Sequence, residues 1–342
     1  MNNCIFINNK DSSSGDGALC WLGANGASND CTFINNTANW GGAILWSGIN
    51  GNLNNCNLSG NYDLGYGGAL FWDGIKGTVS GCIFINNNAT HGGAIEWRGP
   101  NGTVTDSIFI NNAVTGYGGI GGAIAWKGDN GTVNKCNFTN NAATFSGHGG
   151  AIYWNGANGE LANSNFINNK ATSNGGAIYW NGANGSLNNS TSIGNTAIHG
   201  GAVLWNGVNG ALNNCIFINN TARTHGGGVR WLGANGTLMN SIFTSNTAID
   251  SGGGIDWNGA NGTLISSTFT SNTAKEAGGG ICWSGANGSL YSSTFTSNSA
   301  TRGGGISWSG ANSTQSNCNF TNNHATQGNN VLLALDCRRI FK

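Results

Sequence analysis

Four charged side chains fall at or beside the same position of successive repeats of this sequence: Asp73, Glu96, Arg98 and Lys127. Carboxylates held close to a basic group can act as acid and base in glycan cleavage, or can bind calcium. The simpler interpretation is a set of ion pairs between neighbouring repeats. We therefore expect no catalytic residue and predict that the protein is not an enzyme.

Two histidines could ligate a metal ion. His199 and His225 occupy equivalent positions of adjacent repeats, so their imidazoles could lie within reach of one ion. The sequence suggests no third ligand, and a solvated turn explains both residues. We expect no metal site and no cofactor.

Aromatic side chains beside amides could form a platform for sugar rings. Phe71, Tyr153 and Tyr179 share one repeat position, and Asn155 and Asn181 follow the two tyrosines along the chain. We expect all five to face outward as a candidate binding surface. The alternative is that these are scattered surface aromatics without a ligand.

Two insertions break the repeat spacing, at residues 113–120 and 143–148, and both fall at the same place in the repeat. They carry Tyr117 and Phe145. Loops on one edge of a repeat protein are common recognition elements, so we include both residues in the candidate binding surface.

A stripe of outward isoleucines flanks a buried phenylalanine in several repeats. Contiguous exposed apolar residues often mark a partner surface, although strand propensity alone also explains isoleucine here. The candidate contact residues are Ile83, Ile85, Ile108, Ile110, Ile216 and Ile218.

The composition excludes several classes of partner. The 342 residues carry no net charge and no run of basic residues, which argues against nucleic acid and against anionic lipid. No apolar run approaches the roughly 20 residues that a membrane-spanning helix needs. We expect neither nucleic-acid binding nor a membrane span in this chain.

Tryptophan marks an internal repeat of about 26 residues, a length typical of solenoids. Each repeat has alternating apolar positions in a GGAIxW segment and in a CxF segment, separated by turns such as Gly-Ala-Asn-Gly. The sequence therefore predicts an all-β parallel β-helix of about 12 coils. The tryptophans in register are Trp21, Trp46, Trp72, Trp97, Trp126, Trp154, Trp180, Trp205, Trp231, Trp257, Trp283 and Trp308.

Three apolar columns, of tryptophan with isoleucine, of phenylalanine and of leucine, predict three sheets with internal ladders. Charges that vary between repeats should face water, as at Glu96, Arg230 and Asp256. We expect one repeat domain over residues 1–327 and a non-repeat segment over 328–342, a cap or a foreign tail.

Two further repeat positions have structural interpretations. Cysteines such as Cys56 and Cys82 share their position with serines, which predicts small buried residues rather than disulfides. The last residue of each FxxN element, such as Asn36, is asparagine throughout. We expect it to adopt the left-handed conformation of a tight corner and to form a hydrogen-bonded ladder.

The tetrapeptides GGAI (175–178) and FINN (217–220) resemble the GGA[ILV] and FxxN signature of chlamydial polymorphic outer-membrane proteins. The chain is also similar to asparagine-rich adhesin-like surface proteins of methanogenic archaea. This resemblance implies a right-handed β-helix at the cell surface, used for adhesion. It implies an extracellular location and a glycan or protein receptor as partner.

Two other functions stay open at this point. The protein could be a structural solenoid that self-associates along a sheet face or through its coil ends. Ranked last, it could be a polysaccharide lyase or hydrolase, with Glu96 or Asp73 in the active site.

Overall fold

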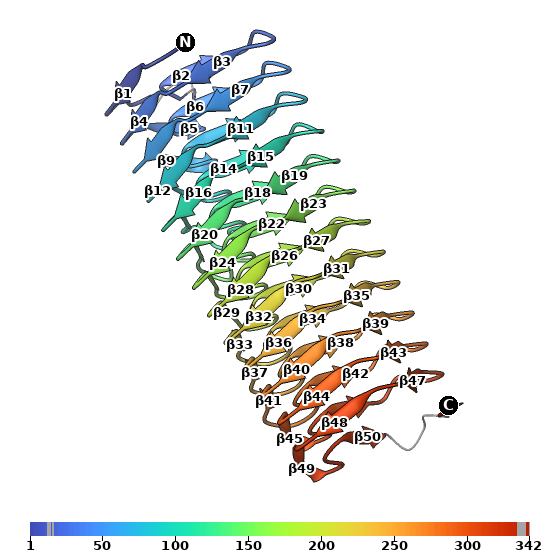
Figure 1. Cartoon of the computed structure of the whole chain (residues 1–342). Coiled ribbons are helices and arrows are strands. Elements are labelled where there is room, and N and C mark those ends of the chain that lie inside the picture. The colour runs from blue at the N-terminus through green and yellow to red at the C-terminus, as the bar shows by residue number, and fades with distance from the viewer. Residues whose placement is uncertain (12–14, 16, 334–339, 342) are drawn as a thin grey trace. The chain divides into compact units, whose positions relative to one another are not determined.

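The computed structural model describes residues 1–11, 15, 17–333 and 340–341, and all secondary structure among them is β (Figure 1). The chain forms two compact units. Unit 1 comprises Met1–Ser173 with Ala177–Gly182, and unit 2 comprises Asn174–Gly176 with Ala183–Lys342. Each unit is a right-handed parallel β-helix, as predicted. Within the described ranges, no helix is long and apolar enough to cross a membrane.

Each coil contributes strands to four sheets. In one coil of unit 1 these are β12 (Ile83–Ile85) in the Phe sheet, β13 (Asn88–Ala89) in the corner sheet, β14 (Ile95–Trp97) in the Trp sheet and β15 (Thr103–Thr105) in the Leu sheet. Their parallel partners in the next coil are β16 (Ile108–Ile110), β17 (Ala113–Val114), β18 (Ile124–Trp126) and β19 (Thr132–Asn134). The three predicted sheets are present. The corner sheet, with mostly two-residue strands, was not predicted.

The Trp sheet and the corner sheet frame the candidate site. In unit 1 the other Trp-sheet strands are β2 (Leu19–Trp21), β6 (Ile44–Trp46), β10 (Leu70–Trp72), β22 (Ile152–Trp154) and β26 (Ile178–Trp180). The other corner strands of unit 1 are β5 (Thr37–Trp40), β9 (Tyr62–Tyr66), β21 (Ala142–Ala143) and β25 (Lys170–Ala171).

Unit 2 repeats this arrangement. Its Trp sheet contains β30 (Val203–Trp205), β34 (Val229–Trp231), β38 (Ile255–Trp257), β42 (Ile281–Trp283), β46 (Ile306–Trp308) and β50 (Val331–Leu333). Its corner sheet contains β29 (Thr196–Ala197), β33 (Thr221–Ala222), β37 (Thr247–Ala248), β41 (Thr273–Ala274), β45 (Ser299–Arg302) and β49 (His324–Gln327). The predicted non-repeat segment therefore supplies a strand, because β50 pairs with β46. Residues 334–339 and 342 of that segment lie outside the described residues.

The predicted indole ladder is confirmed in both units. Neighbouring indole centroids are 4.7 to 5.0 Å apart in unit 1 and 4.6 to 5.0 Å apart in unit 2, with nearly parallel rings. A glycine lies against the ring five residues after most of the ladder tryptophans, whereas Ser313 occupies this position after Trp308. A Cβ atom on Gly236, for example, would overlap the indole of Trp231. The indole ring thus packs directly against the backbone of the next turn, which favours glycine five residues after the tryptophan.

Buried asparagines form the predicted ladder along each unit. Asn61 accepts hydrogen bonds from the backbone nitrogen and Nδ2 of Asn36 at Oδ1, both at 3.0 Å. Its own Nδ2 donates to Asn87 Oδ1 and to the carbonyl of Phe33. The left-handed residue is the preceding one, Asn35, with φ 54°. The prediction therefore placed the left-handed conformation one residue too far along the chain, at Asn36 instead of Asn35.

The interchange of cysteine and serine also has a structural reason. The backbone nitrogen of Cys56 donates to Cys82 Sγ at 3.4 Å, and that of Cys82 donates to Ser107 Oγ at 3.1 Å. Each thiol or hydroxyl also donates to the carbonyl two residues earlier, as in Ser107 to Thr105. A thiol and a hydroxyl can both fill this role, and Cys56, Cys82, Cys136 and Cys215 are buried free thiols.

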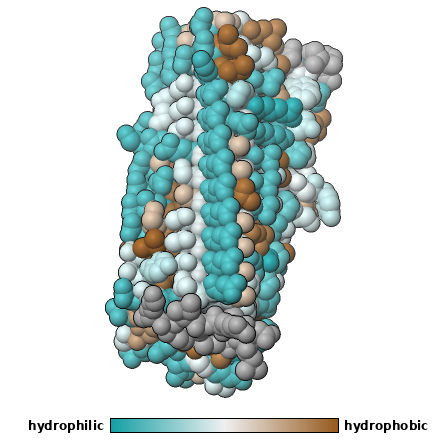
Figure 2. All heavy atoms as spheres, turned by 90° about the vertical axis from the view of Figure 1, so that its right-hand side faces the viewer, coloured by the Kyte–Doolittle hydropathy of each residue, from teal (hydrophilic) through white to brown (hydrophobic). Residues whose placement is uncertain are grey.

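The turns between the Trp sheet and the Leu sheet carry a second, exposed asparagine ladder. In unit 2, Nδ2 of Asn235 donates to Asn209 Oδ1 at 3.0 Å, and Nδ2 of Asn261 donates to Asn235 Oδ1 at 2.9 Å. Figure 2 shows a narrow hydrophilic column on the side of the molecule that it faces. These asparagines have positive φ, and their side chains hydrogen-bond to one another.

Candidate functional site

The candidate site lies where the corner sheet turns into the Trp sheet, at the pair of glycines that opens each GGAIxW segment. Gly92 has φ 60°, and a Cβ atom there would overlap the carbonyl of Ile95. This tight turn brings the residue before the glycines close to the middle residue of a Trp-sheet strand. The ring centroids of Tyr66 and Phe71 are 6.4 Å apart, and those of His148 and Tyr179 are 5.4 Å apart. We call this edge the Gly-Gly corner.

In unit 1 an aromatic stack lines the Gly-Gly corner. The ring centroids of Trp40 and Tyr66 are 5.1 Å apart, and those of Tyr66 and His91 are 5.3 Å apart. Trp40 also contacts Phe71 edge to face at 5.1 Å. Phe71 points away from the helix interior but is only 4% exposed beneath these rings. The prediction of Phe71 as an exposed binding residue is therefore wrong.

Glu96 is the centre of a buried charge cluster. Its Oε1 is 2.6 Å from Lys127 Nζ and 3.1 Å from Arg98 Nε, so the predicted ion pairs are present. Glu96 is 0% exposed, which corrects the prediction that it faces water. The alternation of the strand does direct it outward, but the long side chains of Arg98 and Lys127 cover it. Asp73 is exposed and makes no ion pair within the described residues.

The guanidinium of Arg98 joins the charges to the aromatic stack. Its central carbon lies 4.6 Å from the ring centroid of Tyr66, 4.8 Å from that of Phe71 and 5.6 Å from that of Trp40. Lys127 Nζ is 5.5 Å from the Tyr66 centroid. Cation–π attraction therefore holds both basic groups at the corner.

Asp63 positions Tyr66. Its Oδ1 accepts hydrogen bonds from the backbone nitrogens of Gly65 and Tyr66, at 2.5 and 2.6 Å. Burial raises the pKa of Asp63 to about 7, and the charge of Glu96 contributes to that rise. Asp63, Tyr66 and His91 were not singled out from the sequence. Trp40 stands out in the sequence as the one tryptophan outside the ladder register, but it was not predicted as a site residue.

The predicted tyrosine and amide residues do lie together farther along unit 1. The rings of Tyr153 and Tyr179 stack at 5.2 Å, and Asn181 Nδ2 donates to Asn155 Oδ1 at 2.7 Å. Both tyrosines are half-buried, and burial raises the pKa of each phenol, so both stay neutral at pH 7. Stacking covers one face of each ring, which leaves ring edges and hydroxyl groups as the main contacts for a ligand.

The two insertions form adjacent loops on the same edge of unit 1. The backbone nitrogen of Gly118 donates to the carbonyl of Phe145 at 2.8 Å, and that of His148 donates to the carbonyl of Gly119 at 3.0 Å. Tyr117 is 88% exposed and Phe145 is 64% exposed. Their rings take part in no aromatic contact among the described residues. They are therefore free to contact a partner.

The predicted isoleucine stripe is interrupted within each unit. Ile83 and Ile85 pair with Ile108 and Ile110, and all four are half-buried. The flanking strands of unit 1 present mainly polar residues, namely Asn57, Ser59, Asn137 and Thr139. Ile216 and Ile218 lie in unit 2 between Thr191 and Ile193 on one side and Ile242 and Thr244 on the other. The apolar patch is therefore two coils wide in unit 1 and mixed with threonine over three coils in unit 2, which weakens the case for self-association along this face.

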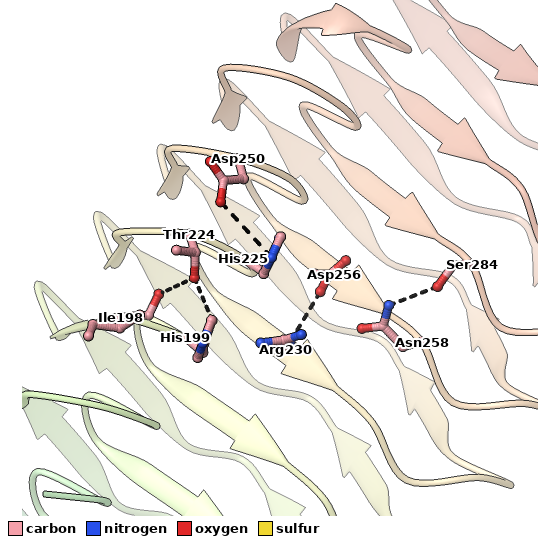
Figure 3. Close-up of polar contacts among 9 residues, drawn as sticks. All are labelled: Ile198, His199, Thr224, His225, Arg230, Asp250, Asp256, Asn258 and Ser284. Carbon is pink, nitrogen blue, oxygen red and sulfur yellow. Dashed lines mark hydrogen bonds and ion pairs between the residues drawn. The ribbon is translucent and has the colours of Figure 1, made fainter. Parts of the chain in front are cut away.

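The Gly-Gly corner of unit 2 is polar (Figure 3). Thr224 Oγ1 donates to the carbonyl of Ile198 at 2.8 Å, so its contact with His199 Nδ1 has the imidazole as donor. Burial, followed by the charge of Arg230, lowers the pKa of His199 to about 4. His199 is therefore a neutral imidazole with its lone pair on Nε2.

The second histidine does not complete a metal site. The rings of His199 and His225 are parallel, with centroids 5.7 Å apart, and His225 Nε2 is 4.0 Å from Asp250 Oδ2. No group of three histidine, cysteine, aspartate or glutamate side chains that could hold a metal ion occurs in the part of the chain that the structure describes. The His199 and His225 rings thus form a stacked pair beside Arg230.

Arg230 and Asp256 form the ion pair expected from their register, with 3.3 Å between Nε and Oδ2 (Figure 3). Asp256 is only 4% exposed, so the prediction that it faces water is wrong. Burial raises the pKa of Asp256 to about 7, and Arg230 offsets only part of that rise.

We expect Asp256→Asn to become progressively more stable than the wild type as pH rises from about 4 to about 7. The folded pKa lies above the unfolded value of 3.8, so folding retains a proton in this window and ionisation destabilises the fold. The gain near pH 8 should be about 4 kcal/mol, because the pKa rises from 3.8 to about 7 and each pKa unit corresponds to about 1.4 kcal/mol. Denaturant unfolding of both proteins across this pH range measures the difference in stability. His199 and His225 are present in both proteins, so their contribution cancels in the comparison. If the stabilities of the two proteins changed in parallel with pH, the raised pKa of Asp256 would be contradicted.

Comparisons with known proteins agree with this fold. The repeat model of the Chlamydia polymorphic membrane protein matches residues 30–45, 135–153, 163–179 and 266–282. A mutant tailspike protein of E. coli bacteriophage HK620, solved in complex with a hexasaccharide, is 12% identical with a TM-score of 0.50, over 97% of this chain and 73% of its own. The Dettilon tailspike protein is 11% identical with a TM-score of 0.44, over 90% of this chain and 62% of its own.

No curated protein matches the sequence. At these identities the likeness to the HK620 tailspike concerns the fold alone. The family match, in contrast, lies on the repeat motifs themselves, because each matched range contains all or part of a CxF-type or GGA-type segment. The chain therefore carries the Chlamydia polymorphic membrane protein repeat at four places, within a parallel β-helix.

Proposed function

We propose that this protein is a non-enzymatic, surface-displayed adhesion module that binds glycans at the Gly-Gly corner of unit 1. The observation that carries the proposal is the concentration of aromatic side chains there. Of the six tyrosines in the sequence, five lie at or beside this corner, and so does the one tryptophan outside the ladder. These residues are Tyr62, Tyr66, Tyr117, Tyr153, Tyr179 and Trp40.

The corner offers the contacts that sugars need. Tyr117 and Phe145 provide free ring faces at the rim, while Tyr153, Tyr179, Asn155 and Asn181 provide hydroxyl and amide groups. Ligand sites generally combine apolar surface with a few polar groups in this way. The repeat family supports surface display, and the HK620 tailspike shows that a β-helix can hold an oligosaccharide.

Burial of Glu96 supports a binding function rather than hydrolysis because, of the two carboxyl groups considered for catalysis, Glu96 and Asp73, only Asp73 is exposed. Glu96, Asp63 and Asp256 are at most 4% exposed. A carboxyl group must come within hydrogen-bond distance of the glycosidic oxygen or of a water molecule to act as acid or base. These three carboxyl groups instead hold basic side chains or backbone nitrogens.

A glycan array probed with the wild type and with a Tyr117→Ala/Phe145→Ala variant tests the proposal. Both residues are exposed, so the variant should fold normally while its affinity for the bound glycan falls at least about tenfold, as expected for aromatic contacts in a binding site. Tyr291→Ala in unit 2 is the matched control and should bind as the wild type does. Unchanged binding by the double variant, or glycan cleavage that Glu96→Gln abolishes, would overturn the proposal.

A further inference from the structure

We propose that the glycan bound at the Gly-Gly corner of unit 1 is acidic, and that Lys127 and Arg98 recognise its anionic groups. The inference rests on the proposed function and names the class of ligand. Its basis is a pair of partly exposed cations, Lys127 and Arg98, over one carboxylate that is fully buried.

The two cations share one oxygen of one carboxylate. Lys127 Nζ and Arg98 Nε both contact Glu96 Oε1, so two positive charges face one negative charge. Asp63 is the other acidic group at the corner, and burial raises its pKa to about 7, which leaves it only partly ionised at neutral pH. Burial also lowers the pKa of His91, which is therefore neutral. Asp73 is exposed and lies in the coil next to Arg98, because Trp72 pairs with Trp97, so the excess of positive charge lies from Arg98 towards Lys127.

Exposure separates the two signs of charge. The side chains of Lys127 and Arg98 are each 31% exposed, whereas Glu96 is 0% exposed. A ligand therefore meets the basic groups and not the carboxylate beneath them. If neutralising Glu96 were their only task, one basic side chain would balance the charge.

Arg98 keeps donors for a ligand. Its Nε donates to Glu96, while its two terminal amino groups make no hydrogen bond or ion pair among the described residues. The rings of Tyr66 and Phe71 hold the guanidinium plane in place. A guanidinium fixed in this way can bind a carboxylate or a sulfate group through two parallel hydrogen bonds.

The register extends the site along the helix axis. Trp72, Trp97, Trp126 and Trp154 pair in turn, so the residues that follow them, Asp73, Arg98, Lys127 and Asn155, occupy one column in successive coils, with the two cations between Asp73 and Asn155. Coils are spaced by about 4.8 Å, so a ligand that contacts several coils must be an extended chain. A chain lying along the corner would meet the two cations first and the tyrosine and amide groups next. A polymer fits this arrangement better than a small anion does.

Two pairs of polysaccharides that differ only in charge test the inference. We would measure binding of the intact protein to polygalacturonate and to its methyl ester, and to dextran sulfate and dextran. The anionic member of at least one pair should bind at least about tenfold more tightly, with a preference that weakens as salt rises from about 0.05 M to about 0.5 M. Lys127→Met should remove most of that preference while keeping the apolar stem.

Lys76→Asn is the matched control for the loss of one positive charge. Lys76 is exposed and has φ 58°, at the turn position where most repeats carry asparagine, so this variant should fold well and keep the preference. Equal binding within both pairs, or an effect of Lys76→Asn as large as that of Lys127→Met, would overturn the inference. Binding of neutral glycans without any charge preference would overturn the inference alone. Failure to bind any glycan on the array would also overturn the proposed function.

Discussion

Replacing Trp257 with alanine is expected to lower the free energy of unfolding of unit 2 by about 3 to 5 kcal/mol, as for other large buried aromatics. Trp257 is fully buried, with the indoles of Trp231 and Trp283 stacked on either side at 4.7 and 4.6 Å. The substitution removes both stacking contacts and leaves a cavity under the turn at Gly262, whose backbone lies against this ring. Neighbouring coils cannot collapse into the cavity without breaking their strand pairing.

Hydrogen exchange locates this loss. Repeat proteins are stabilised mainly by contacts between neighbouring repeats, so protection should fall in β34, β38 and β42 and persist in distant coils of unit 2. Trp40→Ala is the comparison, because Trp40 is 39% exposed and outside the ladder, and we expect it to cost less than half as much. Equal losses for the two variants, or a uniform loss of protection across unit 2, would show that the ladder does not act locally.

The ladders were predictable because they depend only on period and alternation. A tryptophan every 26 residues or so must stack on its equivalent in a solenoid, whatever the details of the turns. The burial of Glu96 was not predictable in this way. Alternation gives the direction of a side chain, but Glu96 is covered by Arg98, which directly follows its strand, and by Lys127 of the next coil. Tyr66 ends the corner strand β9 and His91 follows the two-residue strand β13, and most corner strands are too short to give a periodic signal.

The position of the left-handed residue could have been read more precisely. Two repeats have glycine before the conserved asparagine, at Gly60 and Gly194, and both glycines have positive φ. A position that accepts asparagine, serine and glycine needs a particular backbone conformation, as at Ser245 with φ 55°. The position that accepts only asparagine needs its carboxamide. The backbone conformation and the carboxamide are thus required at two adjacent residues, and the residue types accepted at each position distinguish the two requirements.

The same contrast explains why the corner can vary while the core cannot. A core position must match the equivalent positions in the coils above and below, so a change in one repeat is felt in its neighbours. At the Gly-Gly corner the residue before the glycines is tryptophan, tyrosine, histidine, isoleucine, asparagine, serine, alanine or arginine in different coils. Different coils of one scaffold thus present an aromatic and cationic surface in unit 1 and a histidine and aspartate surface in unit 2.

Asn246→Ala should destabilise unit 2 by about 3 to 6 kcal/mol, because several buried polar groups lose their partners at once. Oδ1 of Asn246 accepts hydrogen bonds from the backbone nitrogen and Nδ2 of Asn220, at 3.0 and 2.9 Å. Its Nδ2 donates to the carbonyl of Phe217 at 2.9 Å and to Asn272 Oδ1 at 3.0 Å. Alanine fills less space and satisfies none of these groups, and each buried polar group without a partner costs about 1 to 3 kcal/mol.

The matched control for this variant is Asn258→Ala, which removes one exposed hydrogen bond, from Asn258 Nδ2 to Ser284 Oγ at 2.8 Å (Figure 3). Because water can replace that bond, we expect a cost below about 1 kcal/mol. Denaturant unfolding measures both variants, and hydrogen exchange at the backbone nitrogen of Asn220 reports the broken ladder directly. If the two variants cost the same, the buried carboxamides do not stabilise the coil, and the constant asparagine needs another explanation. A large difference would show that the hydrogen-bonded ladder requires asparagine at this position in every coil. Replacing one asparagine also leaves donors and acceptors of the neighbouring coils without partners.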